Sequence, residues 1–226
     1  MDEPATPSPE PFLRQLTDDE LADLRSRAIS RRFTRGATIM HQGEAAGRVV
    51  VIERGRAKVT AITEDGTEVV LAFRGPGDVL GELSALGGAS RVATVRALEQ
   101  LDALAVSASD FEAWLEAHPR VALVILKVVI ARLRQADRQQ IEFSAYQTLG
   151  RVARRLVELA ERFGEQRENG LLITLPISQE ELAGWAGASR EATSKALRDL
   201  RDVGLVETRR RHITVRDLDG LRRLVS

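Results

Sequence analysis

Four polar side chains in the segment SREATSKALRDL have the types and the spacing needed to contact DNA bases. Read as a helix, the segment places them on one exposed side near its N-terminus, where a groove-reading helix meets base edges: Arg190, Glu191, Ser194 and Lys195. Arginine can bind guanine in a bidentate manner, and glutamate can accept a hydrogen bond from the cytosine amino group. These residues therefore predict readout of the DNA major groove.

The residues before and within this segment supply the elements that would position it. Ser178 can cap a first helix with Glu181 three residues later, which completes a capping box. Gly187 ends that helix where left-handed backbone is required, and Ser189 caps a second helix that extends to Asp202. Small and apolar residues hold the two helices together at an angle: Leu182, Ala186, Ala192, Ala196, Leu197 and Leu200. This is the spacing of a helix-turn-helix.

A basic turn follows the second helix. The segment LVETRRRHITV alternates around Arg209, Arg210 and Arg211, which predicts a two-stranded wing against a phosphate backbone. The alternative is a solvated charged face on an ordinary helical hairpin. The capping box, the turn glycine and the basic wing occur together at the expected spacings, and this combination favours DNA binding.

A second segment with charged side chains that could bind a ligand is GELSALGGASRVATV, residues 81–95. Glu82 follows a glycine, small residues come next, and Arg91 stands inside a β-branched run. A carboxylate and a guanidinium on either side of a glycine-rich turn could together bind a polar ligand. The alternative is that Gly81 and Glu82 only turn the chain, while Arg91 pairs with a surface carboxylate.

The sequence around Glu82 and Arg91 predicts β-strands. Between residues 34 and 105, short β-branched or alternating segments are separated by glycine-containing turns, a spacing typical of a sandwich or barrel: RVVVIERG, AKVTAITE, EVVLAFRG and VATVRALEQLDALAV. The dipeptide Asp65-Gly66 predicts a hairpin. A short helix over about 18–28, with Thr17 as its N-cap, precedes the strands.

A long helix is predicted between the strands and the helix-turn-helix. A short helix from about Ala108 ends near Pro119, and the chain from there to about Gln147 contains no glycine or proline. Within it, residues recur every three or four positions as the seam of a coiled-coil-like pairing: Ala122, Ile125, Val129, Leu133, Ala136, Gln140 and Phe143. Such a helix is too long to be covered by its own domain, so we expect a homodimer across this seam. The alternative is one long helix folded against the barrel.

A third region begins at Gly150. Val152, Leu156 and Leu159 recur at helical steps and predict a helix with one apolar face. The segment GEQRENG that follows reads as a polar loop.

Composition limits the classes of protein that this chain can be. Its 226 residues, 43% of them hydrophobic, suffice for two domains with their own cores. The absence of cysteine excludes disulfides and thiolate metal sites and fits a reducing compartment, so we expect the cytoplasm. The longest apolar run, 121–131, is much shorter than the roughly 20 residues that span a bilayer, so no membrane segment is expected. Residues 1–11 are expected to form a disordered, proline-rich leader.

Charge is balanced, with 33 basic and 33 acidic residues, and this balance by itself argues against a nucleic-acid binder. Basic side chains are nevertheless in excess after residue 150 and acidic ones before it. Any surface that faces a polyanion should therefore lie in the C-terminal part.

Together these motifs resemble the cyclic AMP receptor protein family of bacterial transcription regulators, within the CRP/FNR superfamily. The resemblance rests on SREATSKALRDL, HQGE at 41–44, the GEL…R…A segment and the long helix between them. It implies an α+β fold with a jelly-roll-like cyclic-nucleotide-binding β-barrel over 12–118, a dimerisation helix over 119–148 and a winged helix-turn-helix over 149–226. A palindromic double-stranded DNA site, a homodimer and RNA polymerase are the implied partners.

The resemblance also implies roles for individual residues. In the family's phosphate-binding cassette, backbone amides and an arginine hold a cyclic phosphate, and a glutamate accepts the ribose 2′-hydroxyl. The matching positions are Gly81, Glu82 and Leu83 of the turn, Arg91 for the phosphate, and Val92 and Ala93 with their amides. The DNA-binding set is Ser178, Ser189, Arg190, Glu191, Ser194, Lys195, Arg209 and Arg210.

Two places depart from the family pattern. Val92 stands where the bacterial receptor has a serine, which removes a hydroxyl and keeps the backbone amide. The threonine–serine pair that meets adenine maps to Ala136 and Asp137, so the base-recognition hydroxyls are absent. Asp137 can accept from a purine amino group or can be a solvated helix residue. Arg132 is expected to pair with Glu82 when the site is ordered.

The expected function is thus a sequence-specific DNA-binding transcription regulator whose allosteric effector is a cyclic nucleotide, cAMP or cGMP. The alternatives are the same regulator with another effector or none, and a cyclic-nucleotide regulatory subunit without DNA binding. The histidines, His41, His118 and His212, are far apart in the sequence, which disfavours a metal-dependent barrel enzyme. No catalytic motif emerges, so neither an enzyme, a metal site nor a cofactor is expected.

Overall fold

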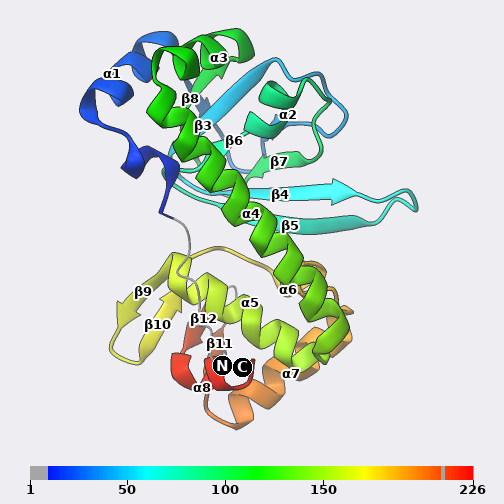
Figure 1. The fold of residues 1–226 in the computed structure, drawn as a ribbon. Coiled ribbons are helices and arrows are strands. Elements are labelled where there is room, and N and C mark those ends of the chain that lie inside the picture. The colour runs from blue at the N-terminus through cyan, green and yellow to red at the C-terminus, as the bar shows by residue number, and fades with distance from the viewer. Residues whose placement is uncertain (1–9, 210–211, 226) are drawn as a thin grey trace. The chain divides into compact units, whose positions relative to one another are not determined.

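The computed structural model describes residues 10–209 and 212–225 (Figure 1). These residues form two compact bodies, the first ending at Arg134 and the second beginning at Gln135. The long helix α4 (Pro119–Ala145) contributes to both. No helix within the described ranges is both long and apolar enough to cross a membrane. Arg210 and Arg211, which we predict in the wing, lie outside the described residues, as do residues 1–9 of the predicted leader.

Two four-stranded antiparallel sheets form the centre of the first body, as the expected β-barrel requires. The first sheet has the order β1 (Ile29–Phe33), β8 (Leu101–Ser107), β3 (Arg48–Arg54) and β6 (Val79–Leu80). The second has the order β2 (Thr38–Met40), β7 (Thr94–Ala97), β4 (Ala57–Ile62) and β5 (Glu68–Arg74). The segment VATVRALEQLDALAV is therefore not one strand, because β7 and β8 lie in different sheets.

Burial on both faces explains the apolar run of β3. Val49 and Val51 pack with α1 (Asp18–Arg27), α3 (Ala108–Ala117) and the first half of α4. Val50 and Ile52 belong instead to a core that contains residues of both sheets. A strand covered on both faces shows no alternation of apolar and polar residues.

Two local predictions for the first body are confirmed. Thr17 caps α1 and forms a capping box with Glu20. The β4–β5 hairpin turns at Asp65-Gly66, where Gly66 has a φ of 85°. This hairpin extends beyond the neighbouring strands (Figure 1).

The first body covers two residues of the predicted α4 seam, and the helix ends at Ala145, before the predicted end near Gln147. Ile125 is 4% exposed in the core of the first body, and Val129 packs against the same core. In the first half of α4, the exposed large apolar side chains have 39% to 61% of their surface accessible: Leu123, Leu126, Ile130 and Leu133. This half of α4 is apolar nearly all round, so its periodicity alone does not tell which stripe covers its own strands. Of the predicted seam, the structure therefore buries Ile125 and partly buries Val129. Leu133 lies in an open stripe with Leu123, Leu126 and Ile130, and the other predicted seam residues are exposed as well: Ala122, Ala136, Gln140 and Phe143.

The second body is a helical layer combined with a small sheet. After α5 (Thr148–Phe163), it contains β9 (Gly164–Arg167), β10 (Gly170–Ile173), α6 (Gln179–Ala186), α7 (Arg190–Asp202), β11 (Val206–Arg209), β12 (His212–Val215) and α8 (Leu218–Arg223). The predicted apolar face of α5 is confirmed, because Val152, Leu156 and Leu159 are fully buried. The sheet has the order β11-β12-β10-β9, so the wing strands are half of a larger sheet. The prediction of a polar loop at GEQRENG is wrong: this segment contains β9, an exposed edge strand without an apolar pattern.

One carboxylate joins α1 to the start of α4. Arg120 Nε donates to Glu20 Oε1 at 2.8 Å, and the Thr17 amide donates to Oε2 at 2.8 Å. The hydrogen bonds from Arg120, followed by those from Thr17, lower the pKa of Glu20 from 4.5 to about 2. The native state therefore favours the ionised form of Glu20.

We expect Glu20→Gln to lower the free energy of unfolding by about 1–2 kcal/mol at pH 7, because a depressed carboxyl pKa stabilises the folded state and Arg120 is half exposed. This contribution is complete above the unfolded pKa of 4.5 and is lost as the pH falls towards 2. Denaturant unfolding of both proteins as a function of pH should therefore show their stabilities converging in acid. Glu53→Gln, which removes an exposed pair with Arg25, is the control and should cost less. A difference that is the same at pH 7 and pH 3 would contradict the role of the Glu20 charge.

Candidate effector site and nucleic-acid interface

A close approach of backbone and guanidinium defines the first candidate site. Gly81 precedes α2 (Glu82–Gly87) and has a φ of 82°. A Cβ built at Gly81 would lie 2.5 Å from Arg91 Nη1 and 2.9 Å from Met40 Cε. Both the left-handed backbone and the contact with Arg91 therefore require glycine at this position.

Arg91 is an enclosed cation held by backbone carbonyl groups. Its side chain donates to the carbonyl oxygens of Gly81, at 2.8 Å, and of Arg48, and the residue is 5% exposed. No described carboxylate lies within ion-pair distance of Arg91, so the alternative of a surface ion pair is wrong. Burial, followed by the Arg48 guanidinium, lowers the pKa of Arg91. An anion that entered here would meet a positive charge not neutralised by an ion pair.

Glu82 is buried beside this cation and is linked to the long helix. The carboxylate is 1% exposed and forms an ion pair with Arg132 of α4, the pairing expected from the sequence. Arg132 Nη2 also donates to the Val79 carbonyl at 2.7 Å. A ligand that binds Glu82 would thus directly alter the ion pair of Glu82 with Arg132 of α4.

The other predicted effector residues differ in their accessibility. Leu83 and Val92 are exposed, and Ala93 is buried. Ala136 and Asp137 are exposed on α4, in the part that belongs to the second body. Their contact with a base stays a prediction.

Sequence reasoning missed two charged neighbours of Arg91. The Glu44 carboxylate accepts the His41 amide at 3.0 Å, and this hydrogen bond, with the charges of His41, Arg48 and Arg91, lowers the pKa of Glu44. Arg48 donates to the Ile39 carbonyl at 2.7 Å. The motif HQGE contains Glu44 and was a signal for it, whereas Arg48 is only the first residue of a strand in the sequence.

The two helices of the second candidate site begin and end as predicted. Ser178 and Glu181 form the capping box of α6, with amide–side-chain distances of 2.9 and 3.1 Å. Gly187 has a φ of 59°, and Ser189 Oγ accepts the Ala192 amide at 3.1 Å at the start of α7. Short-range hydrogen bonds thus fix where α7 begins.

The two faces of α7 separate as a groove-reading helix requires. Arg190, Glu191 and Lys195 are exposed, and Ser194 is half-buried. The buried face consists of Thr193, Ala196, Leu197 and Leu200, with Ala192 only partly buried. Hydrogen bonds from the Glu191 amide and the Ser189 side chain lower the pKa of Glu191. Glu191 is therefore ionised at neutral pH and can only accept hydrogen bonds.

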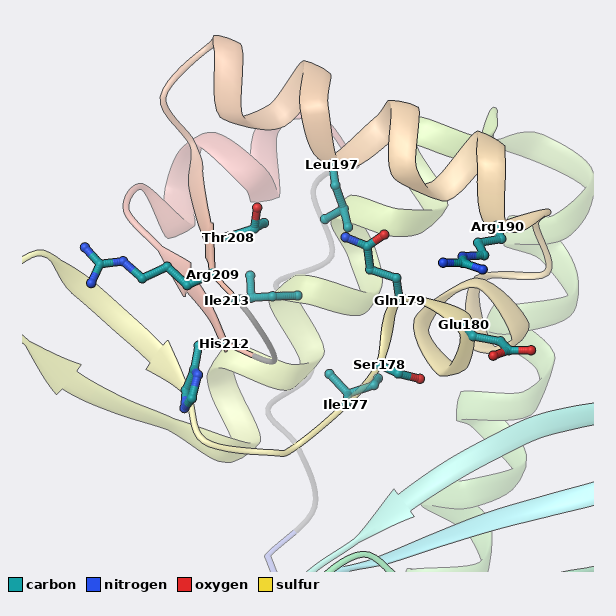
Figure 2. Close-up of a pocket in the computed structure, with 10 residues that line it drawn as sticks. All are labelled: Ile177, Ser178, Gln179, Glu180, Arg190, Leu197, Thr208, Arg209, His212 and Ile213. Carbon is teal, nitrogen blue, oxygen red and sulfur yellow. The ribbon is translucent and has the colours of Figure 1, made fainter.

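A pocket of about 330 Å³ lies between α6, α7 and the wing strands (Figure 2). In Figure 2, Arg190 and Glu180 lie at one side, and Arg209 and His212 extend from the wing strands at the other. Gln179 and Thr208 are two further polar residues that line it, and sequence reasoning missed both. The described residues include no group of acidic residues and histidines that could hold a metal ion.

Comparison with known domain families gives two matches, one in each body. Residues 30–118 match the cyclic nucleotide-binding domain, and residues 150–224 match the Crp-like helix-turn-helix domain. The first range contains Gly81, Glu82 and Arg91. The second contains all of α6, α7 and the wing strands.

Comparison with whole proteins gives relatives of similar length. The chain is 31% identical over 191 residues to the CRP-like cAMP-activated global transcriptional regulator of Mycobacterium tuberculosis, covering 84% of this chain and 85% of that protein. It is 28% identical over 186 residues to the global nitrogen regulator of Synechocystis sp., covering 81% and 82%. A solved structure of a c-di-GMP responsive global regulator from Xanthomonas campestris has a TM-score of 0.78 at 22% identity, covering 89% of this chain and 100% of that one. At that identity the likeness shows the fold alone.

Proposed function

Because the chain belongs to the cyclic AMP receptor protein family of transcription regulators, we propose that it binds a palindromic DNA site as a dimer under the control of a cyclic nucleotide, with cAMP as the leading candidate. Members of this family bind DNA, act as dimers and are not enzymes. RNA polymerase is the partner through which a regulator of this kind would act on transcription.

The observation that carries the proposal is the buried pair of groups at Arg91 and Glu82. Arg91 presents a guanidinium that is bonded only to backbone carbonyl groups, and Glu82 is bonded to Arg132 of the long helix. A cyclic phosphate provides the single negative charge that suits one guanidinium, and a ribose hydroxyl can donate to a buried carboxylate. In this mechanism, the bound nucleotide shares Glu82 with Arg132 and shifts the population of α4 conformations.

A second candidate function is the same DNA-binding regulator with a different effector. It is favoured by Ala136 and Asp137, which stand where the family has its base-recognition hydroxyls. The relatives also differ in function, since one is a cAMP-activated regulator and another a nitrogen regulator. This alternative keeps the DNA-binding role and changes only the ligand.

The deciding experiment is a titration of cAMP and, separately, cGMP against the full-length protein and a labelled duplex. The duplex is first selected from a random library by the protein itself, with each nucleotide present in turn. We expect fluorescence anisotropy to show affinity that rises at least about tenfold, or ~1.4 kcal/mol, with one of the nucleotides. Equal DNA affinity with and without both nucleotides would contradict cyclic-nucleotide control, and failure to select any duplex would contradict DNA recognition.

The open stripe of α4 supports the dimer interface. We expect Leu133→Glu to weaken dimerisation at least about 100-fold, because two buried leucines are lost and two charges would be placed in the seam. Sedimentation velocity over a range of protein concentrations measures this change. Leu71→Glu, on the exposed surface of β5, is the matched control and should leave the dimer intact. A dimer of unchanged affinity would show that the Leu133 stripe is not the interface.

A further inference from the structure

Two arginines of α5 hold the end of the long helix against the helix-turn-helix. We propose that Arg151 and Arg155 are positioning residues for DNA reading, because they clamp the last turns of α4 to the turn that precedes α7. The inference rests on the proposed function, since it presumes that α7 reads DNA. All the residues involved belong to the second body.

Arg155 forms the buried part of the clamp and connects three helices. It is 1% exposed, forms an ion pair with Glu142 of α4, and donates to Glu158 of α5 at 2.6 Å. Its guanidinium also lies over the Trp185 ring of α6, 5.2 Å from the ring centroid. Removing one partner from a buried ion pair leaves an uncompensated charge, so this arrangement resists separation of the helices.

Arg151 forms the second part of the clamp, at the turn itself. Its Nε donates to the Ala186 carbonyl at 2.9 Å, and its Nη2 donates to the Gly187 carbonyl at 3.1 Å. These carbonyl groups are at the C-terminus of α6, where no further intrahelical donor is available. Its Nη1 donates to the Tyr146 carbonyl at 2.7 Å, which joins the turn to the residue that follows α4.

Phe143 closes the clamp from the side of α4. A Cβ built at Gly187 would lie 2.4 Å from Phe143 Cε1, so the ring rests directly on the turn. The Arg151 guanidinium lies 5.9 Å from the centroid of the same ring. Gly187 therefore serves two needs, the left-handed backbone and the space that Phe143 occupies.

These contacts make residues 142–146 part of the DNA-reading unit. If α4 rotates, we expect α7 to move with it. The reason is that Arg151 bonds both the turn before α7 and Tyr146, the residue that follows α4. In a dimer the two α7 helices enter the major groove one helical turn of DNA apart, and this distance sets the half-site spacing. The clamp should therefore determine how strictly the protein discriminates between spacings.

The test measures the spacing penalty, which is the loss of affinity when one or two base pairs are added between the half-sites of the selected duplex. For the wild-type protein we expect a penalty of about 30-fold or more, since the two recognition helices no longer fit both half-sites. In Arg151→Gln and Arg155→Met the penalty should fall by about tenfold, within the range of coupling energies between contacting residues. A merely structural defect would weaken all spacings alike and leave the penalty unchanged.

Arg154→Met is the matched control, because Arg154 pairs with Glu142 at 3.1 Å but bonds neither Trp185 nor the turn. It should keep the wild-type spacing penalty. Arg151 is only half-buried, so Arg151→Gln is expected to fold. Its spacing penalty therefore tests the clamp even if Arg155→Met is unstable. A folded Arg151→Gln protein with the wild-type penalty overturns the clamp while the DNA-binding proposal stands. Absence of specific DNA binding by the wild-type protein overturns the proposed function and the clamp together.

Discussion

Arg91→Ala is expected to weaken cAMP binding at least about 100-fold, or ~3 kcal/mol, because charge-assisted hydrogen bonds to an enclosed phosphate are lost. Arg91 is positioned by two carbonyl groups and the Gly81 turn. Isothermal calorimetry with cAMP measures the loss. Arg91→Lys, which keeps the charge without the planar fork, should give an intermediate affinity.

The control is Arg96→Ala, which removes an exposed arginine from β7 of the same body. It should leave nucleotide affinity within about threefold, since an exposed charge is largely screened. Thermal unfolding of all three variants establishes that the barrel is intact. If Arg91→Ala is folded and binds cAMP normally, Arg91 does not bind the phosphate. Ala136 and Asp137 would then favour a different ligand.

Helix starts and tight turns could be predicted from the sequence because the interactions that fix them are short-range. Ser178 and Ser189 are bonded to amides three residues later, and Gly187 adopts the left-handed backbone required at the end of α6. The same is true of Thr17 at α1 and of the Asp65-Gly66 hairpin. Each of these features needs only a few neighbouring residues to form.

The face that α4 turns to its own strands could not be predicted. Ile125 and Leu126 are adjacent and equally apolar, and both fit a helical repeat. Only the strands and helices packed against Ile125 decide which of them is buried. The strand β9 was missed for a related reason, since its pairing with β10 satisfies backbone groups and leaves no apolar alternation in GEQRENG.

The candidate effector site was predictable in its key residues but not in its bonding. Spacing and resemblance indicated Arg91 and Glu82, whereas the carbonyl of Arg48 that holds the guanidinium is a backbone group, which no sequence motif marks. The roles of the clamp residues Arg151 and Arg155 could not be predicted from the sequence for a similar physical reason. Their partners lie on other helices, and a helical arginine is most often a solvated side chain.

Arg190→Ala is expected to cost about 1–3 kcal/mol at one base pair and to relax sequence preference there, because a bidentate arginine distinguishes guanine from the other bases. Arg209→Ala should act differently. Its side chain extends from the wing and is 82% exposed, with Glu207 as an ion-pair partner at 2.9 Å. If it contacts phosphate, its loss weakens all duplexes alike and reduces the salt slope of binding by about 1.

The two variants serve as controls for each other, since both remove one arginine from the lining of the same pocket. Binding is measured with the selected duplex and with single base-pair variants of it, each at several salt concentrations. Arg190→Ala should change the ranking of the duplexes, and Arg209→Ala should preserve it. A uniform loss for Arg190→Ala would identify Arg190 as a phosphate contact instead, and base reading would then have to come from Glu191, Ser194 and Lys195 of α7.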